Sequence, residues 1–203
     1  MHLDNDGIKY RLKSIYAKGE WGESARAGET ALGYLKLELQ WTACNLETMQ
    51  TVAYAYGMLK QFEKSRRMYL ACVEILDSSH GKESKEAALV MANFTNFEST
   101  IRDPIWKKKE GVLLRKEALR RMEAAFGKTD LRTLQCMGCL AESYFLRGLL
   151  RSARRIQEDQ VNHFTNRFGE NNPETIVAKE NLAKTRMWIA IREALYWWLP
   201  KRS

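Results

Sequence analysis

The chain has 203 residues, a formal net charge of +8, 45% hydrophobic residues and three prolines. A chain of this length can bury a large core, and so few helix breakers favour an all-α protein over one built from strands. The acidic start argues against a secretory signal, and no apolar stretch is long enough to span a bilayer. We therefore expect a cytoplasmic protein.

An internal repeat organises the sequence. Small residues recur at one slot, Ser24, Ser65, Gly111 and Ala153, with separations of 41, 46 and 42 residues. The positions three, seven, eight and eleven residues after each of them are apolar, with Gln160 as the single polar exception. These offsets place one apolar stripe on a helix of 3.6 residues per turn, and the small residues allow helices to approach closely. The spacing predicts a stack of helical hairpins in a single domain over residues 1–203.

The first two hairpins are predicted over about 6–40 and about 44–80. In each, a shorter first helix precedes the small-residue slot, and Gly19 or Lys60 occupies the turn to the second helix. Two residues after this turn, Trp21 and Phe62 can plug the helix pair. Gly81 follows the second hairpin, where a left-handed helix C-cap favours glycine.

The third hairpin is predicted over about 84–126 and needs an insertion of about four residues, placed in the turn 101–107. It then aligns with Thr95 at the small position of its first helix and Glu98 at the next slot, where the neighbouring hairpins have tyrosine. Phe97 stands one residue earlier. Gly127 supplies the expected C-cap.

The fourth hairpin is predicted over about 130–168, with Gly148 in its turn and Gly169 at its end, and a capping helix follows over about 173–198. A stack of hairpins must cover its last apolar face. We expect the apolar residues of the final helix to do this, and contact with a membrane surface is the alternative. These residues are Met187, Trp188, Ile189, Ile191, Leu195, Trp197 and Trp198.

Two segments resemble a known family. LAESYFLRGLLRSA, residues 140–153, resembles the tetratricopeptide (TPR) signature of small residue, aromatic residue, turn glycine and alanine. FGENNPETIVAKENLA, residues 168–183, resembles the long repeats of kinesin light chains and related fungal or bacterial proteins, in which an HPxT turn leads into an NNLA helix. The resemblance implies a right-handed α-α superhelix, a TPR-like solenoid, of about four hairpins plus a C-terminal capping helix.

The same resemblance implies that the first helix of each hairpin lines a concave, peptide-binding groove. Asn93 and Asn181 match the asparagine with which related domains hold the backbone of a ligand, and an amide can donate and accept at once. The alternative is that each asparagine satisfies a neighbouring helix. The predicted groove residues are Tyr10, Lys13, Thr51, Tyr54, Asn93, Asn96, Gln135, Cys139, Glu142, Asn181 and Lys184.

Recognisable catalytic or cofactor chemistry is absent from the sequence. Cys136 and Cys139 form a CxxC, but it lies in a helical pattern without a second pair or a suitable histidine, so we interpret both as packing cysteines. Gly127-Lys128-Thr129 imitates the end of a phosphate loop without the first glycine or a preceding strand. We expect no enzyme activity, no cofactor and no metal.

The sequence thus predicts a protein-interaction scaffold with a protein or peptide partner. One alternative is a regulatory nucleic-acid-binding protein that uses basic outer helices, and the other is a homo-oligomerising adaptor; membrane binding is not favoured. Two runs of basic residues raise the nucleic-acid alternative, although we interpret them as solvated helix faces. They are Arg115, Lys116, Arg120 and Arg121, and then Arg147, Arg151, Arg154 and Arg155.

Overall fold

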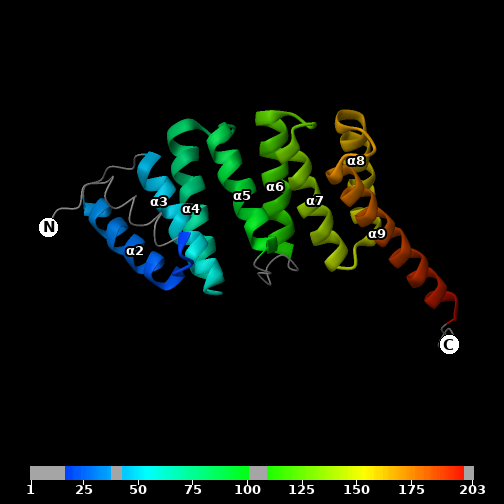
Figure 1. Ribbon diagram of the computed structural model, residues 1–203, viewed down its shortest axis with the longest axis horizontal. Helices are drawn as coiled ribbons and strands as arrows, with labels where there is room; N and C mark the ends of the chain where they lie inside the picture. Colours follow the sequence, from blue (N-terminus) through cyan, green and yellow to red (C-terminus); the bar gives the residue numbers. More distant parts are fainter. Residues whose placement is uncertain (1–16, 38–42, 101–108, 199–203) are drawn as a thin grey trace. The chain divides into compact units, whose positions relative to one another are not determined.

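The computed structural model describes residues 17–37, 43–100 and 109–198, and every regular element in these ranges is an α-helix (Figure 1). The helices are α2 (Trp21–Leu37), α3 (Ala43–Met58), α4 (Phe62–His80), α5 (Lys85–Thr100), α6 (Lys109–Phe126), α7 (Leu131–Leu146), α8 (Leu150–Phe168) and α9 (Pro173–Trp198). This confirms the predicted all-α fold. The first helix of hairpin 1 and the predicted insertion at 101–107 lie outside the described residues.

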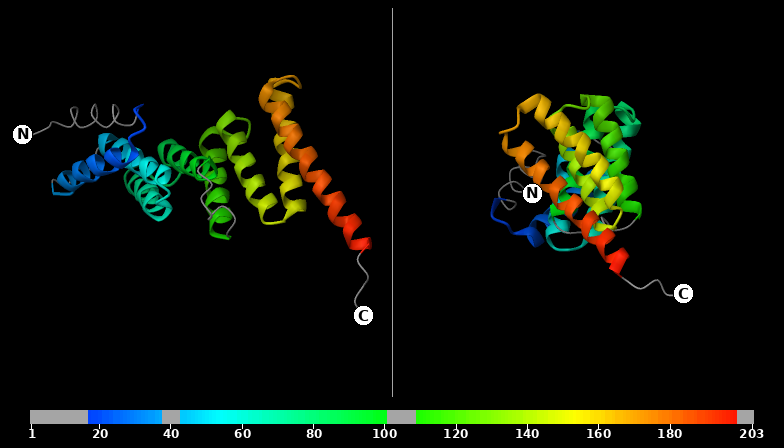
Figure 2. Two further views of the ribbon diagram at one scale, coloured as in Figure 1. Left: turned by 60° about the horizontal axis from the view of Figure 1, so that its bottom comes forward. Right: turned by 90° about the vertical axis from the view of Figure 1, so that its right-hand side faces the viewer.

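The helices gather into two compact units, Met1–Asp103 and Pro104–Ser203. In unit 1, α2 packs on α3, α3 on α4 and α4 on α5; in unit 2, α6 packs on α7, α7 on α8 and α8 on α9. Successive helices are therefore spatial neighbours, as Figure 2 shows for each unit. Such next-neighbour packing is typical of a helical repeat.

The repeated small residues mark where the helices pack closely. Ser24 and Ala153 are fully buried, Ser65 is 2% exposed and Gly111 is buried. The apolar offsets after Ser65 are buried at Cys72, Val73 and Leu76, and those after Ala153 end in the buried Phe164. The predicted second helices are thus confirmed in register for α4 and α8.

The turns repeat as well as the helices. The glycines predicted after the second helices, Gly81, Gly127 and Gly169, have φ of 85°, 84° and 87°. In the turns inside the hairpins, Gly19 and Gly148 have φ of 72° and 70°, and Lys60 adopts the same left-handed conformation with φ of 60°. Lysine rarely adopts this conformation because of its Cβ atom, so the repeat imposes it on Lys60.

A chain of aromatic rings forms the centre of unit 1. Trp21 of α2 contacts Tyr54 of α3 with ring centroids 5.6 Å apart, and Tyr54 stacks on Phe97 of α5 at 4.2 Å. Tyr69 of α4 lies 6.2 Å from Phe97 and stacks on Phe94 at 4.7 Å. These contacts join the described helices α2 to α5 of the unit. Offset aromatic pairs of this kind add to the stabilisation that burial provides.

A buried ion pair accompanies these rings. Glu98, the acid predicted at an aromatic slot, is 1% exposed, and its Oε1 lies 3.5 Å from Nε of Arg66 on α4. Arg66 also contacts Glu63 at 2.6 Å. The partner cation explains how this slot of α5 accepts an acid, because a buried carboxylate is tolerated when it is paired.

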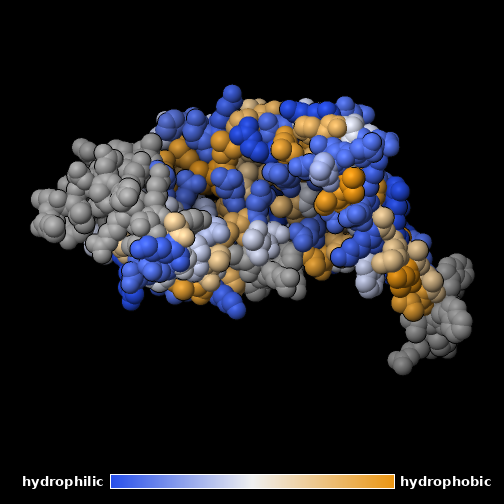
Figure 3. Space-filling view, in the orientation of Figure 1, coloured by the Kyte–Doolittle hydropathy of each residue, from blue (hydrophilic) through white to orange (hydrophobic). Residues whose placement is uncertain are grey.

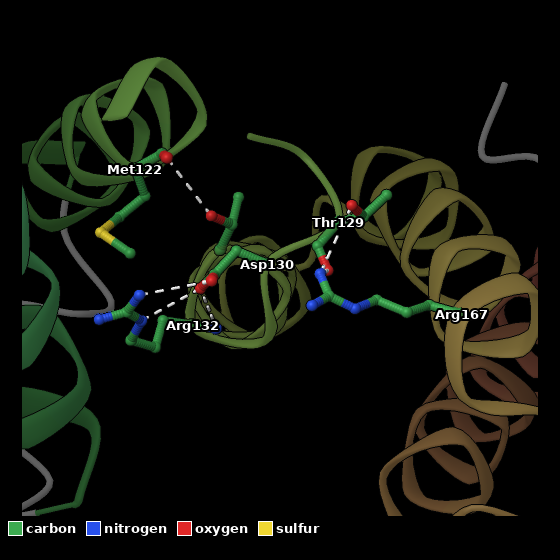
Figure 4. A network of polar contacts seen from close by, with 6 residues as sticks. Met122, Thr129, Asp130, Arg132 and Arg167 are labelled. Carbon is green, nitrogen blue, oxygen red and sulfur yellow. Dashed lines mark hydrogen bonds and ion pairs between the residues drawn. The ribbon is translucent and has the colours of Figure 1, made fainter. Parts of the chain in front are cut away.

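Unit 2 has its own apolar core, and a side chain caps the N-terminus of its helix α7. Leu134 and Met137 of α7 pack with Phe164 of α8 and Ala178 of α9. At the start of α7, the Asp130 carboxylate accepts hydrogen bonds from the backbone N–H and Nε of Arg132 at 2.9 and 3.1 Å (Figure 4). The side-chain bond from Arg132 is the main reason that the pKa of Asp130 is lowered.

Neighbouring contacts fix this end of α7 on both sides (Figure 4). The Thr133 hydroxyl donates to the backbone oxygen of Met122 on α6 at 3.4 Å. Arg167 of α8 donates to the backbone oxygen of Thr129. The turn between α6 and α7 is therefore held by both second helices of unit 2.

The interpretation of the first basic run as a solvated face is wrong for two of its residues. Arg115 is 1% exposed and donates to the Gly111 carbonyl at 3.2 Å, and Arg121 is 6% exposed and bonds Glu117 at 2.8 Å. Arg120 bonds the same carboxylate at 2.9 Å. Helix α6 buries these long side chains because their charged ends find acceptors inside the packing.

The prediction that the apolar residues of the last helix cover the end of the stack is wrong for four of them. Their exposures are 52% for Met187, 46% for Trp188, 39% for Ile191 and 57% for Leu195. Figure 3 shows this apolar surface near the C-terminal end of α9. Only Ile189 of the described members is half-buried, and the Trp197 and Trp198 side chains lie outside the described ones. Helix α9 covers α8 with a different face, which includes Ala178 and Leu182.

None of the helices in the described ranges is long and apolar enough to cross a membrane.

Candidate peptide-binding rows

The predicted groove residues that the structure describes lie on the first helices α3, α5, α7 and α9. Tyr10 and Lys13 lie outside the described residues. Thr51 and Tyr54 belong to α3 and both are half-buried. The Thr51 hydroxyl donates to the Glu47 carbonyl one turn earlier at 2.9 Å, and Tyr54 takes part in the aromatic chain of unit 1. Both therefore have structural contacts of their own.

Helix α5 exposes one of its two predicted residues to solvent. Asn93 is exposed although its neighbours Ala92 and Phe94 are 3% and 1% exposed. Asn96, three residues further along, is half-buried. The Asn93 amide therefore points away from the core of unit 1, as the groove hypothesis requires.

In unit 2, the predicted residues Gln135, Glu142, Asn181 and Lys184 are all exposed, and Cys139 is half-buried. The row thus presents amides, one acid and one cation.

Phe145 of α7 was missed by the sequence reasoning. The Lys184 ammonium of α9 lies 5.5 Å from the centre of its ring. This contact joins the exposed sides of α7 and α9, since a cation is attracted to the face of an aromatic ring. In the sequence, Phe145 follows Tyr144 and looks like another core aromatic residue. Its contact with Lys184 becomes visible only when the position of α9 is known.

The CxxC pair is set up for packing. Cys136 is 2% exposed and burial raises the pKa of its thiol to about 12. Burial also raises the pKa of Cys139 to about 11, although the positive charge of Arg115 acts in the opposite direction. Both thiols are protonated at neutral pH, whereas a reactive or metal-binding cysteine needs the thiolate.

The sequence reasoning also missed a small pocket in unit 1. It measures about 280 Å³ and lies between α2 and the α3–α4 hairpin. The Tyr56 hydroxyl donates to the Glu29 carboxylate at its wall, and the Lys64 ammonium lies 5.0 Å from the centre of the Tyr56 ring. These residues have no common spacing in the sequence, and their polar groups bind one another. Across residues 17–37, 43–100 and 109–198, no three His, Cys, Asp or Glu side chains gather into a metal site.

Paired helices in a constant register, left-handed turns and next-neighbour packing define a TPR-like helical repeat protein. No protein-family model and no curated protein sequence matches the chain. Solved structures do match it. One is a Podosopora anserina protein described as a kinesin light chain with nearly identical TPR-like repeats; it is 14% identical, with a TM-score of 0.76 over 96% of this chain and 92% of that one. A variant of that protein gives 14% identity and a TM-score of 0.77 over 95% and 92% of the two chains.

BtubC from P. vanneervenii is similar as well, with 17% identity and a TM-score of 0.68 over 89% of this chain and 70% of that one. These similarities confirm the predicted TPR-like fold, which kinesin light chain structures share. Folds of this class generally mediate protein–protein interaction through the surface of their stacked helices.

Proposed function

We propose that the chain is a protein-interaction scaffold that holds an extended or helical segment of a partner along the exposed rows of its first helices. The observation that supports this most is the alternation of exposed amides with buried neighbours. Gln135 is exposed between Leu134 and Cys136, which are 0% and 2% exposed, and Asn181 is exposed beside Leu182 at 7%. With Asn93, they place amide groups on rigid helices.

Such amides suit the recognition of a peptide backbone. Each one can donate to a carbonyl and accept from an N–H of the bound segment. Because the helices that carry them are packed into the core of each unit, the amides lose little freedom on binding, which favours affinity. Glu142 and Lys184 add one charge of each sign, so the unit 2 row fits a segment of mixed charge better than a purely acidic one.

The nucleic-acid alternative receives less support from the basic runs. Arg115 and Arg121 are buried, and the exposed Arg151 and Arg154 lie 3.6 and 3.7 Å from the carboxylates of Glu193 and Glu158. Phosphate binding needs clustered cations that are open to solvent. The proposal also includes a cytoplasmic location and no catalytic role, both inferred from the sequence.

The test compares two double variants of the whole chain. Asn93→Ala with Asn181→Ala removes two row amides, and Asn162→Ala with Asn166→Ala removes two exposed amides from the second helix α8. All four positions are exposed, so both proteins are expected to fold as the wild type by circular dichroism. Proximity labelling or pulldown should recover partners with the wild type and the α8 variant, and lose them with the row variant. Equal recovery by both variants would reject the row as the binding surface.

A further inference from the structure

Helices α7 and α9 are structural equivalents, 42 residues apart. Asp130 before α7 accepts from the N–H of Arg132 at 2.9 Å, and Asn172 before α9 accepts from the N–H of Glu174 at 3.0 Å. The glycines at the ends of the preceding helices, Gly127 and Gly169, have φ of 84° and 87°. Both helices therefore begin in the same way.

The face of α7 that packs on α6 and the face of α9 that packs on α8 also carry equivalent residues. Leu140 and Leu182 are 4% and 7% exposed, and Ser143 and Thr185 are 0% and 1% exposed. The last two hydroxyls donate to the carbonyl one turn earlier at the same distance of 3.1 Å. The repeat register thus extends through α9, with no shift.

The face toward the following second helix differs. In α7, Leu134 and Ala141 are both 0% exposed, because α8 covers them and Gln160 donates to the Leu134 carbonyl at 2.8 Å. Their equivalents in α9, Ile176 and Ala183, are 44% exposed and exposed. In Figures 1 and 2, α9 is the last of the described helices of unit 2, and it packs on α8. The face of α9 that is equivalent to the α8-binding face of α7 is therefore exposed in the described part of the chain.

The uncovered face continues as a stripe along α9. Val177, Met187 and Trp188 are 55%, 52% and 46% exposed, and the charged Glu180 and Lys184 are exposed between them. An exposed apolar stripe that is interrupted by charges is typical of an interaction site. The order of its residues indicates what it binds.

The stripe is complementary to itself when two copies of α9 run antiparallel. With the two-fold axis level with Leu182, which itself lies on the opposite, buried face of α9, Glu180 of one copy faces Lys184 of the other. Ile176 and Val177, which precede Leu182, then meet Met187 and Trp188 of the other copy, which follow it. One register therefore matches both the apolar and the charged residues.

Other arrangements lack this match. A parallel pair in register would place Glu180 against Glu180 and Lys184 against Lys184, which is destabilising. Ala183, next to the axis, has a small side chain and lets the two helices approach closely, as Ala153 does inside unit 2. We propose that the uncovered face of α9 binds α9 of a second copy in this antiparallel register.

The test uses charge reversal and light scattering of the whole chain over a dilution series. The wild type should change between the 23.6 kDa monomer and twice that mass. Glu180→Lys or Lys184→Glu alone replaces two attractive contacts with two repulsive ones, and should raise the dimer dissociation constant about ten-fold or more. The double variant Glu180→Lys with Lys184→Glu restores opposite charges across the axis and should dimerise as the wild type does.

A matched control reverses an exposed charge away from the stripe. Arg155→Glu on α8 should leave the dimer unchanged. Lys184 is a row residue and Glu180 is not, so the single variant Glu180→Lys separates pairing from peptide binding, which the Asn93 and Asn181 variant tests. The proposal is overturned by a wild type that stays monomeric at high concentration, with or without binding to vesicles containing phosphatidylserine. A dimer that is equally strong in both single variants overturns it too.

Discussion

Gly138 lies in α7 where Gln160 of α8 reaches across to the Leu134 carbonyl. A Cβ atom at position 138 would lie 2.8 Å from the Gln160 amide nitrogen, so alanine forces this amide to shift, and we expect its 2.8 Å bond to the Leu134 carbonyl to be lost. Alanine alone stabilises a helix interior by about 1 kcal/mol relative to glycine. A buried donor without its acceptor costs about 1–3 kcal/mol. We expect Gly138→Ala to lower the free energy of unfolding by about 1 kcal/mol.

The assay is urea unfolding of the wild type, Gly138→Ala, Gln160→Ala and the double variant, followed by circular dichroism. When residue 160 is alanine, the added Cβ meets no amide, and only the gain in helix propensity remains. Gly138→Ala should then raise the free energy of unfolding by about 1 kcal/mol, so its effect changes sign between the two backgrounds. If the substitution stabilises both backgrounds equally, the reasoning is refuted.

Three further predictions concern single side chains. Lys60→Gly should raise the free energy of unfolding by about 0.5–1 kcal/mol in urea, because φ of 60° strains a residue with a Cβ atom; no change would mean an unstrained turn. Glu98→Ala should lower it by about 3 kcal/mol, whereas Glu98→Leu with Arg66→Leu should recover most of the loss, since the orphaned charge is then removed; equal losses would contradict the buried pair. The pKa of Glu117 is lowered to about 2, first by the hydrogen bond from Arg120, so its contribution exists above pH 4.5 and disappears as the pH falls toward 2. Because the Glu117 side chain is 37% exposed, we expect Glu117→Gln to cost below about 1 kcal/mol at pH 7, and the difference from wild type in urea should vanish near pH 2.

The helical repeat could be predicted from the sequence because its signals are local. The small residue Ala153, the apolar offsets after it and the glycine at 169 are all set by the geometry of one helix and its C-cap. Lys60 was also placed correctly in its turn, because the repeat spacing assigns that position whether or not it holds a glycine. The groove residues stay a prediction, although the exposure of Asn93 and Asn181 is compatible with it.

The two wrong expectations depended on neighbours that periodicity does not reveal. Arg115 looks like a surface residue, and it is buried because α6 packs on α7 and the guanidinium donates to the Gly111 carbonyl. Met187 and Trp188 look like core residues, and they are exposed because an apolar side chain does not specify which element covers it. Tyr54 is half-buried and stacks on Phe97. This contact also could not be predicted from the sequence, because it depends on the position of α5.

The equivalent capped turns before α7 and α9 indicate how a protein of this kind can gain helical hairpins. A segment from the start of α7 to the end of the turn before α9 is bounded by the equivalent caps Asp130 and Asn172. Duplicating this segment would insert one complete hairpin between matching helix caps. Tandem duplication in the coding DNA can therefore lengthen unit 2 in whole-hairpin steps, and the packing of the first copy of α8 on the second copy of α7 would be the new interface.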